Sequence, residues 1–172
     1  MIDLHCHMLP GIDDGAPDLE TALEMARIAV ADGITTLACT PHIYAGLYEN
    51  NGPDIKRAVA QLRSQLQAAD IPLNLTHGAD THLAPDLVAG LRNQHIPSLH
   101  DSRYFLLEPP HHVAPPRLEQ SVFDLLAAGY IPVITHPERL TWISGHYEVF
   151  QQLAKAGAWV QVTAGSLTGH FG

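Results

Sequence analysis

Short apolar runs alternate with segments of helical periodicity along the whole chain. The clearest helical segment is residues 53–69, where Ile55, Val59, Leu62 and Leu66 recur on one stripe. The apolar runs contain β-branched residues and end at Gly, Pro or His-Pro, as strands commonly do. This pattern predicts helices at residues 17–32, 53–69, 85–94, 116–128 and 147–156. It predicts strands at residues 1–6, 34–40, 73–77, 104–108, 130–135 and 158–163.

Strands that alternate with helices in this way are typical of βα units around a parallel sheet. We therefore expect an α/β fold with about six strands. No linker or change of composition divides the chain, so we expect one domain over residues 1–172. Periodicity alone does not distinguish an open doubly wound sheet from most of a distorted β/α barrel.

Composition excludes several classes of partner. The formal net charge of −9 argues against a nucleic-acid surface, which needs clustered Lys and Arg. No apolar run is long enough to cross a membrane, and the N-terminus does not resemble a signal peptide. The two cysteines, Cys6 and Cys39, form no CxxC motif and fit the core of a protein in a reducing compartment. We therefore expect a cytoplasmic protein without membrane insertion. The sequence does not indicate the oligomeric state.

Polar residues of one chemical kind recur where the predicted strands end. In parallel α/β folds the βα loops converge at those ends, and sites assemble there. His5 and His7 are two residues apart on a strand, so they point to the same side and can reach one metal ion. Alone, this pair could be two unrelated surface histidines, but a cluster of His and carboxylates marks a metal site. The candidate ligands at strand ends are His5, His7, His42, Asp80, Glu108 and His136.

A further candidate ligand, Asp14, lies in the turn-rich loop of residues 11–15. Asp in such a loop often only caps a turn, and Asp13 is the weaker candidate of the pair. Asp18 is better explained as a helix cap. A ligand set of nitrogen and oxygen without thiolate suits Mn²⁺, Zn²⁺ or Fe. Several carboxylates indicate more than one ion, and paired ions can clamp a phosphoryl oxygen and activate water.

Arg139 follows His136 by three residues and is the candidate for phosphate binding, because guanidinium can hold two phosphate oxygens at once. The alternative is a salt bridge, for example with Glu138. The turn at residues 163–166 could also present backbone N–H groups to an anion. We expect His82 and the His111-His112 pair to shape access to the site without binding metal. The other histidines are expected to be exposed or hydrogen-bonded: His77, His95, His100, His146 and His170.

Five segments resemble the bacterial capsule and exopolysaccharide tyrosine phosphatases, a family of the polymerase and histidinol phosphatase (PHP) superfamily. The HxH pair is shared at superfamily level, whereas the segments His136-Pro-Glu-Arg139 and Thr163-Ala-Gly-Ser-Leu-Thr-Gly169 are more specific. The resemblance covers the whole chain. The matching segments are residues 2–15, 38–42, 105–108, 134–139 and 161–169.

The resemblance implies a distorted β/α barrel of PHP type, with seven strands in the family and about six in this chain. It implies a centre of up to three divalent ions, usually Mn²⁺. It assigns ligand roles to His5, His7, Asp14, His42, Glu108 and His136, and phosphate binding to Arg139.

Two departures from the family pattern matter. Asp80 stands where the family usually has a bridging Glu, one methylene longer. By the resemblance, residues 1–172 form a PHP-type metallophosphoesterase domain without the family's C-terminal strand and helix, which carry an Asp-x-His pair and another Arg.

The sequence therefore predicts a metal-dependent protein-tyrosine phosphatase that acts on the phosphotyrosine-bearing tail of a bacterial tyrosine kinase controlling capsule or exopolysaccharide synthesis. The predicted catalytic residues are Arg139, Asp14 and His42. The alternatives are a small-molecule phosphatase of the histidinol-phosphate type and a non-catalytic metal-binding domain with an incomplete centre. A deacetylase-like hydrolase is weaker, because Arg139 would have no anion to bind. The predicted metal ligands are His5, His7, Asp14, His42, Asp80, Glu108 and His136.

Overall fold

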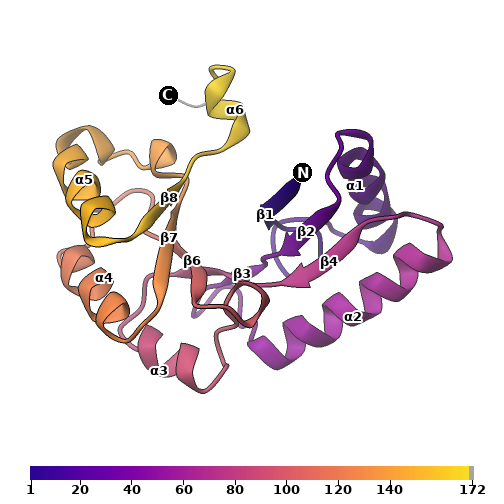
Figure 1. The fold of residues 1–172 in the computed structure, drawn as a ribbon, viewed down its shortest axis with the longest axis horizontal. Helices are drawn as coiled ribbons and strands as arrows, with labels where there is room; N and C mark the ends of the chain where they lie inside the picture. The colour runs from indigo at the N-terminus through magenta and orange to yellow at the C-terminus, as the bar shows by residue number, and fades with distance from the viewer. Residues whose placement is uncertain (171–172) are drawn as a thin grey trace.

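The computed structural model describes residues 1–170 and has an α/β fold in which all pairs of named strands are parallel (Figure 1). The six predicted strands are all present, and two short strands that the pattern did not predict follow the second and the third of them. The predicted strands are β1 (Ile2–Cys6), β2 (Thr36–Cys39), β4 (Asn74–His77), β6 (Tyr104–Glu108), β7 (Ile131–Thr135) and β8 (Trp159–Gln161). The additional strands are β3 (His42–Ile43) after β2 and β5 (Asp80–His82) after β4.

The residues between β2 and β3 and between β4 and β5 form a bend that joins two sheets. The strand orders of the sheets are β1-β2-β4 and β3-β5-β6-β7-β8. Backbone pairing continues across the bend: Gly78 N donates to Cys39 O at 3.0 Å, and Asp80 N donates to Pro41 O at 3.1 Å. His42 then pairs with Asp80 in the register that β2 and β4 already have. Pro41 has no N–H to give to the ladder, which explains why the regular strand stops there. The bend therefore places two candidate ligands side by side.

The strands lie in the order in which they occur along the chain, as a β/α barrel requires. Among residues 1–170, β1 and β8 share no backbone ladder, so the sheet is an open arc. The α/β fold class is confirmed, and closure into a barrel stays a prediction.

The predicted helices flank this arc on its two sides (Figure 1). Their bounds are α1 Leu19–Ala31, α2 Gly52–Ala68, α3 Leu87–Arg92, α4 Leu118–Ala127 and α5 Tyr147–Ala156. Asp18 caps α1 as predicted, because its Oδ1 accepts from Thr21 N at 2.8 Å. A short helix that the pattern did not predict, α6 (Ala164–Leu167), follows β8. No helix among the described residues is long and apolar enough to cross a membrane.

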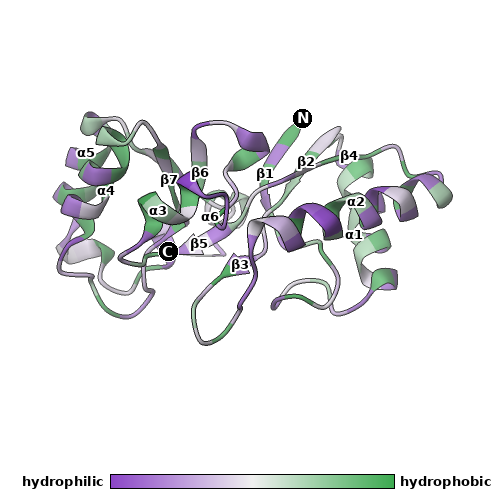
Figure 2. Cartoon of the chain, turned by 90° about the horizontal axis from the view of Figure 1, so that it is seen from below, coloured by the Kyte–Doolittle hydropathy of each residue, from purple (hydrophilic) through white to green (hydrophobic). Residues whose placement is uncertain are grey.

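Two main hydrophobic cores hold the strands. The first lies under β1, β2 and β4, where the predicted stripe of α2 packs against Leu37. The second gathers Phe105, Leu107 and Ile134 with the inner faces of α3 to α5. Figure 2 shows hydrophobic and hydrophilic residues alternating along α4 and α5, as expected of helices that are buried on one face. Cys39 is buried in the first core and Cys6 packs against it, as predicted. The strand ends are therefore fixed by packing on either side of the bend.

Candidate metal centre

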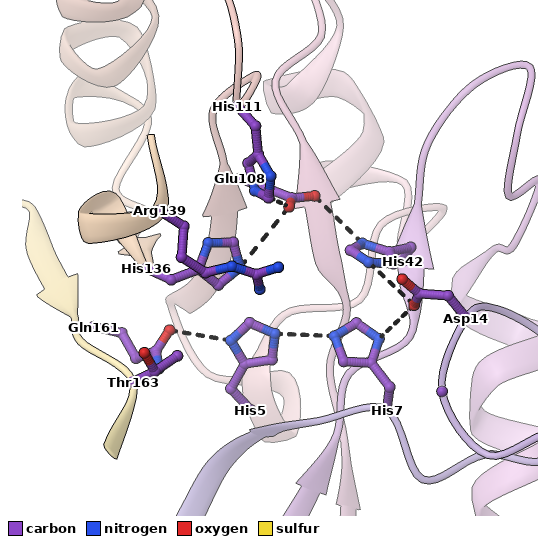
Figure 3. A pocket seen from close by; sticks show the side chains of 11 residues that line it. His5, His7, Asp14, His42, Glu108, His111, His136, Arg139, Gln161 and Thr163 are labelled. Carbon is purple, nitrogen blue, oxygen red and sulfur yellow. Dashed lines mark hydrogen bonds and ion pairs between the residues drawn. The ribbon is translucent and has the colours of Figure 1, made fainter. Parts of the chain in front are cut away.

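The predicted site residues converge at the C-terminal ends of the strands (Figure 3). They surround a pocket of about 380 Å³, called here the metal pocket. Asp80 does not line the open pocket, because its side chain is fully buried within contact distance of His5 and His136. The predicted residues that line the metal pocket are His5, His7, Asp14, His42, Glu108, His136 and Arg139.

His5 Nε2, His7 Nε2 and Asp80 Oδ2 lie close to one another. His7 Nδ1 donates to Asp13 Oδ2 at 2.7 Å and His5 Nδ1 donates to Gln161 Oε1 at 3.1 Å, so the neutral form of each ring has its lone pair on Nε2. The two Nε2 atoms lie 3.1 Å apart, and Asp80 Oδ2 lies 3.3 Å from His5 Nε2. Atoms that bind one ion at about 2.1 Å lie about 3 to 3.5 Å from each other. These atoms therefore fit a divalent cation, which would offset the repulsion between them.

His42 connects this group to the remaining carboxylates. Its Nε2 lies 3.4 Å from Asp14 Oδ1, and its Nδ1 lies 3.3 Å from Glu108 Oε2. Because the candidate groups share members, the centre can hold more than one ion. The groups whose ligand atoms lie close enough are His5-His7-Asp80, His7-Asp14-His42, His42-Asp80-Glu108 and Glu108-His111-His136.

Asp80 is the buried charge at the base of the centre. Its Oδ1 accepts from Thr135 Oγ1 at 3.3 Å, whereas its Oδ2 has no hydrogen-bond donor. Oδ2 faces His5 Nε2 and, at 3.7 Å, His136 Nε2. Burial would raise the pKa of Asp80, but His136 and His5 outweigh that effect and hold it below its usual range. Because Thr135 is hydrogen-bonded to Oδ1, the Asp80 carboxylate presents only Oδ2 to the centre.

Asp13 supports the centre from behind, a role that the sequence reasoning missed. Its side chain is fully buried, and its carboxylate accepts from His7 Nδ1, from His42 N at 3.0 Å and from Gly15 N at 3.0 Å. Burial would raise the pKa of Asp13, but the bonds from His7 and Gly15 hold it low. Gly15 allows this packing, since a Cβ there would lie 2.0 Å from His7 O. Asp14, in contrast, is 60% exposed at the rim of the pocket.

His111 also reaches the centre, although we predicted that it would only shape access. Its Nε2 lies 3.0 Å from Glu108 Oε1, and its ring meets that of His136 edge to face at 5.3 Å between centroids. Its position three residues after Glu108 was the only indication in the sequence. We considered residues directly at strand ends as ligands, and Pro109 and Pro110 separate His111 from the end of its strand.

Arg139 extends from a short 3₁₀ turn, η2 (Pro137–Arg139), across the pocket in front of His136 (Figure 3). His136 has a left-handed backbone with φ of 31°, which turns the chain at the end of β7. The Glu138 carboxylate is engaged elsewhere: its Oε1 accepts from Thr163 N at 2.8 Å and from Ser166 Oγ at 2.9 Å. This arrangement ties the turn at residues 163–166 to η2, and Arg139, the last residue of η2, lines the pocket.

The surrounding carboxylates control the charge of the histidines. Burial lowers the pKa of His42, but Glu108, Asp80 and Asp14 outweigh it and raise the pKa to about 9. The pKa of Glu108 is held low, since the contact with His42 outweighs burial. The carboxylates around His42 thus favour a positive charge at this position.

Three histidines away from the pocket have local partners. His77 Nε2 lies 3.2 Å from Asp101 Oδ1, His100 Nδ1 bonds Thr76 Oγ1 and His146 Nδ1 bonds Trp142 O. No candidate metal group among the described residues includes them.

Parallel strands that direct histidines, carboxylates and an arginine into one pocket define a metal-dependent hydrolase of the α/β class. Over residues 1–172 the chain matches the family described as capsular polysaccharide synthesis, CpsB/CapC, and it belongs to that family. The predicted family and enzyme class are confirmed.

Named relatives agree with this assignment. The chain is 42% identical over 172 residues to the tyrosine-protein phosphatase YwqE of Bacillus subtilis (strain 168). The aligned region covers 100% of this chain and 68% of the relative. It is 27% identical over 164 residues to the tyrosine-protein phosphatase CpsB of Streptococcus pneumoniae, covering 95% of this chain and 68% of the relative. A solved structure from work on YwqE and CpsB, described as metal-dependent tyrosine phosphatases, superposes with a TM-score of 0.93 at 41% identity. That match covers 97% of this chain and 68% of the other.

Proposed function

We propose that this chain is a metal-dependent protein-tyrosine phosphatase that acts in the cytoplasm on the phosphotyrosine-bearing tail of a bacterial tyrosine kinase controlling capsule or exopolysaccharide synthesis. The observation that carries the proposal is the convergence of histidine ring nitrogens and carboxylate oxygens beside Arg139. The names of the relatives support phosphotyrosine as the substrate.

The proposed ligands are those predicted from the sequence, with His111 as an addition beside Glu108 and His136. We propose up to three divalent ions, Mn²⁺ first, with Zn²⁺ or Fe as alternatives, because the donors are imidazole and carboxylate. When bound, such ions supply Lewis acidity and an activated water for attack on phosphorus.

The chain's own residues would position the phosphate and manage protons. The Arg139 guanidinium can donate two parallel N–H bonds to the non-bridging oxygens, whose charge must be stabilised in the transition state. Asp14 Oδ1 and His42 Nε2 face each other at the open side of the pocket, where they can hold a proton between them. Asp13 fixes the tautomer of His7, which keeps the Nε2 lone pair directed inward.

The test is hydrolysis of a phosphotyrosyl peptide with added Mn²⁺ and then with chelator. We expect activity that needs metal and that falls about 100-fold in Arg139→Ala, the usual cost of losing one group that stabilises developing charge. Arg139→Lys should recover only part, because an ammonium cannot bind two oxygens in parallel.

Arg27→Ala is the matched control, because Arg27 is exposed on α1 and pairs with nearby Glu24, away from the pocket lining. Hydrolysis that survives chelation, or that Arg139→Ala leaves unchanged, would contradict the proposal. Faster turnover of histidinol phosphate than of the peptide would favour the small-molecule alternative.

A further inference from the structure

A second pocket of about 410 Å³ opens beside the metal pocket. The two pockets share a wall made of Asp14, His42, Glu108 and His111, so a molecule bound in one is adjacent to the other. The rest of the second pocket is chiefly aromatic and apolar. The residues that line only this pocket are Tyr44, Leu47, Tyr48, His82, Pro110, His112 and Val113.

Flat ring pairs form part of its lining. The Tyr44 and His82 rings stack with centroids 3.9 Å apart and an interplanar angle of 4°. The Tyr48 ring stacks on His42 at 5.5 Å and 12°. Aromatic rings prefer such stacked or edge-to-face arrangements with further rings. The pocket therefore offers several ring surfaces beside the candidate metal ligands.

The two pockets differ in charge and in exposure of apolar groups. Arg139 lines the metal pocket, whereas neither Lys nor Arg lines the second pocket. Leu47 and Val113 line the second pocket together and are 61% and 69% exposed. Apolar side chains that gather in one exposed patch can mark a binding surface. A ligand that is anionic at one end and aromatic at the other matches this division.

We propose that the second pocket, named here the aryl pocket, binds the phenyl ring of the substrate's phosphotyrosine while the phosphate lies in the metal pocket. This inference rests on the proposed function and adds the part of the site that selects the substrate. One oxygen joins the ring to phosphorus, so the ring must lie next to the phosphate. The aryl pocket is next to the metal pocket, across the shared wall. Phosphoserine has no group to fill the aryl pocket, which therefore favours aryl over alkyl phosphates.

The loop that carries Tyr44 is held by its backbone. Tyr44 N donates to Tyr48 O at 3.0 Å, and Tyr48 N donates to Tyr44 O at 2.8 Å. Both bonds remain when the Tyr44 side chain is shortened, so Tyr44→Ala tests ring binding without removing the fold of the loop.

The experiment measures binding of two non-hydrolysable probes, phenylphosphonate and methylphosphonate, to the Mn²⁺-loaded full chain by calorimetry. Tyr44→Ala should weaken phenylphosphonate about ten-fold and leave methylphosphonate unchanged, because only the first probe has a ring to stack. Tyr44→Phe should keep the wild-type preference. Tyr147→Ala is the control, since this exposed tyrosine on α5 lies outside both pockets.

The inference is overturned if Tyr44→Ala weakens both probes equally or neither, or if the wild-type chain binds neither probe. Failure of the proposed function has a different signature. In that case the preference for phenylphosphonate and its loss in Tyr44→Ala remain, while the phosphotyrosyl peptide is not hydrolysed.

Discussion

The N-terminal region, with β1, β2 and β4, and the C-terminal region, with β6 to β8, support their candidate ligands in different ways. β1 is an edge strand whose outward residues Ile2 and Leu4 are 65% and 45% exposed. β6 and β7 are instead buried from their second residue to their last. Glu108 therefore ends a strand that is fixed by packing, and His136 follows another, whereas His5 and His7 depend more on the hydrogen bonds that they donate to Gln161 and Asp13.

The comparison teaches that the centre belongs to neither region. Each region has its own hydrophobic core, and the bend between them supplies the adjacent pair His42 and Asp80. Relative movement of the two cores would separate His7 from Glu108, so the site requires both cores to be intact.

The first prediction compares the two cores. Leu62→Ala in the first core and Leu125→Ala in the second should each lower the free energy of unfolding by about 2–5 kcal/mol, because both side chains are almost fully buried. If residues 1–172 form one domain, as we predict, denaturant melts of both variants show a single shifted transition. A second transition in either variant would mean that the regions unfold separately.

The second prediction concerns the bend. Asp80→Asn should reduce bound Mn²⁺ and lower kcat at least about 100-fold, because it removes the buried charge between His5 and His136. Metal analysis of the purified variant checks the first effect, and peptide hydrolysis checks the second. Asp80→Glu adds a methylene at a fully buried position, so we expect a cost of about 1–3 kcal/mol in stability. Unchanged stability would show that the site has room for the longer carboxylate.

The third prediction weakens only the support of the N-terminal region. Asp13→Asn should lower Mn²⁺ affinity about 10- to 100-fold, because the amide no longer fixes the tautomer of His7. Calorimetric titration with Mn²⁺ measures this change. Asp70→Asn is the control, since Asp70 lies in an exposed turn at a positive φ that Asn also tolerates. Equal affinity in Asp13→Asn and wild type would assign Asp13 to the fold alone.

The smallest expected effect is a pH dependence. Carboxylates raise the folded-state pKa of His42 from 6.5 to about 9, so the protonated form stabilises the metal-free chain. That contribution is complete below about pH 6.5 and is lost as the pH rises through 9. The Tm measured in chelator should therefore fall between these values, and less so in His42→Gln. Mn²⁺ binding should strengthen over the same range, because the metal competes with the proton. A Tm that rises towards pH 9 in both proteins would contradict this account.

The sequence by itself determined the main helices and strands and which residues are candidates for the site. Periodicity distinguishes helix from strand, and the strand ends then identify His5, His7, His42, Asp80, Glu108 and His136 as neighbours, because parallel strands align their carboxyl ends. These features are local or follow from one general rule of sheet geometry.

The tertiary structure decided which groups touch. The bend at Pro41 and Gly78, the burial of Asp13 behind His7, and the contact of His111 with Glu108 all join segments whose relative position no periodicity encodes. The aryl pocket likewise depends on loops that are far apart in the chain. The physical reason is that the position of a residue along a helix or strand fixes the side to which its side chain points. Which residue it then contacts depends on how segments that are distant in the sequence pack together.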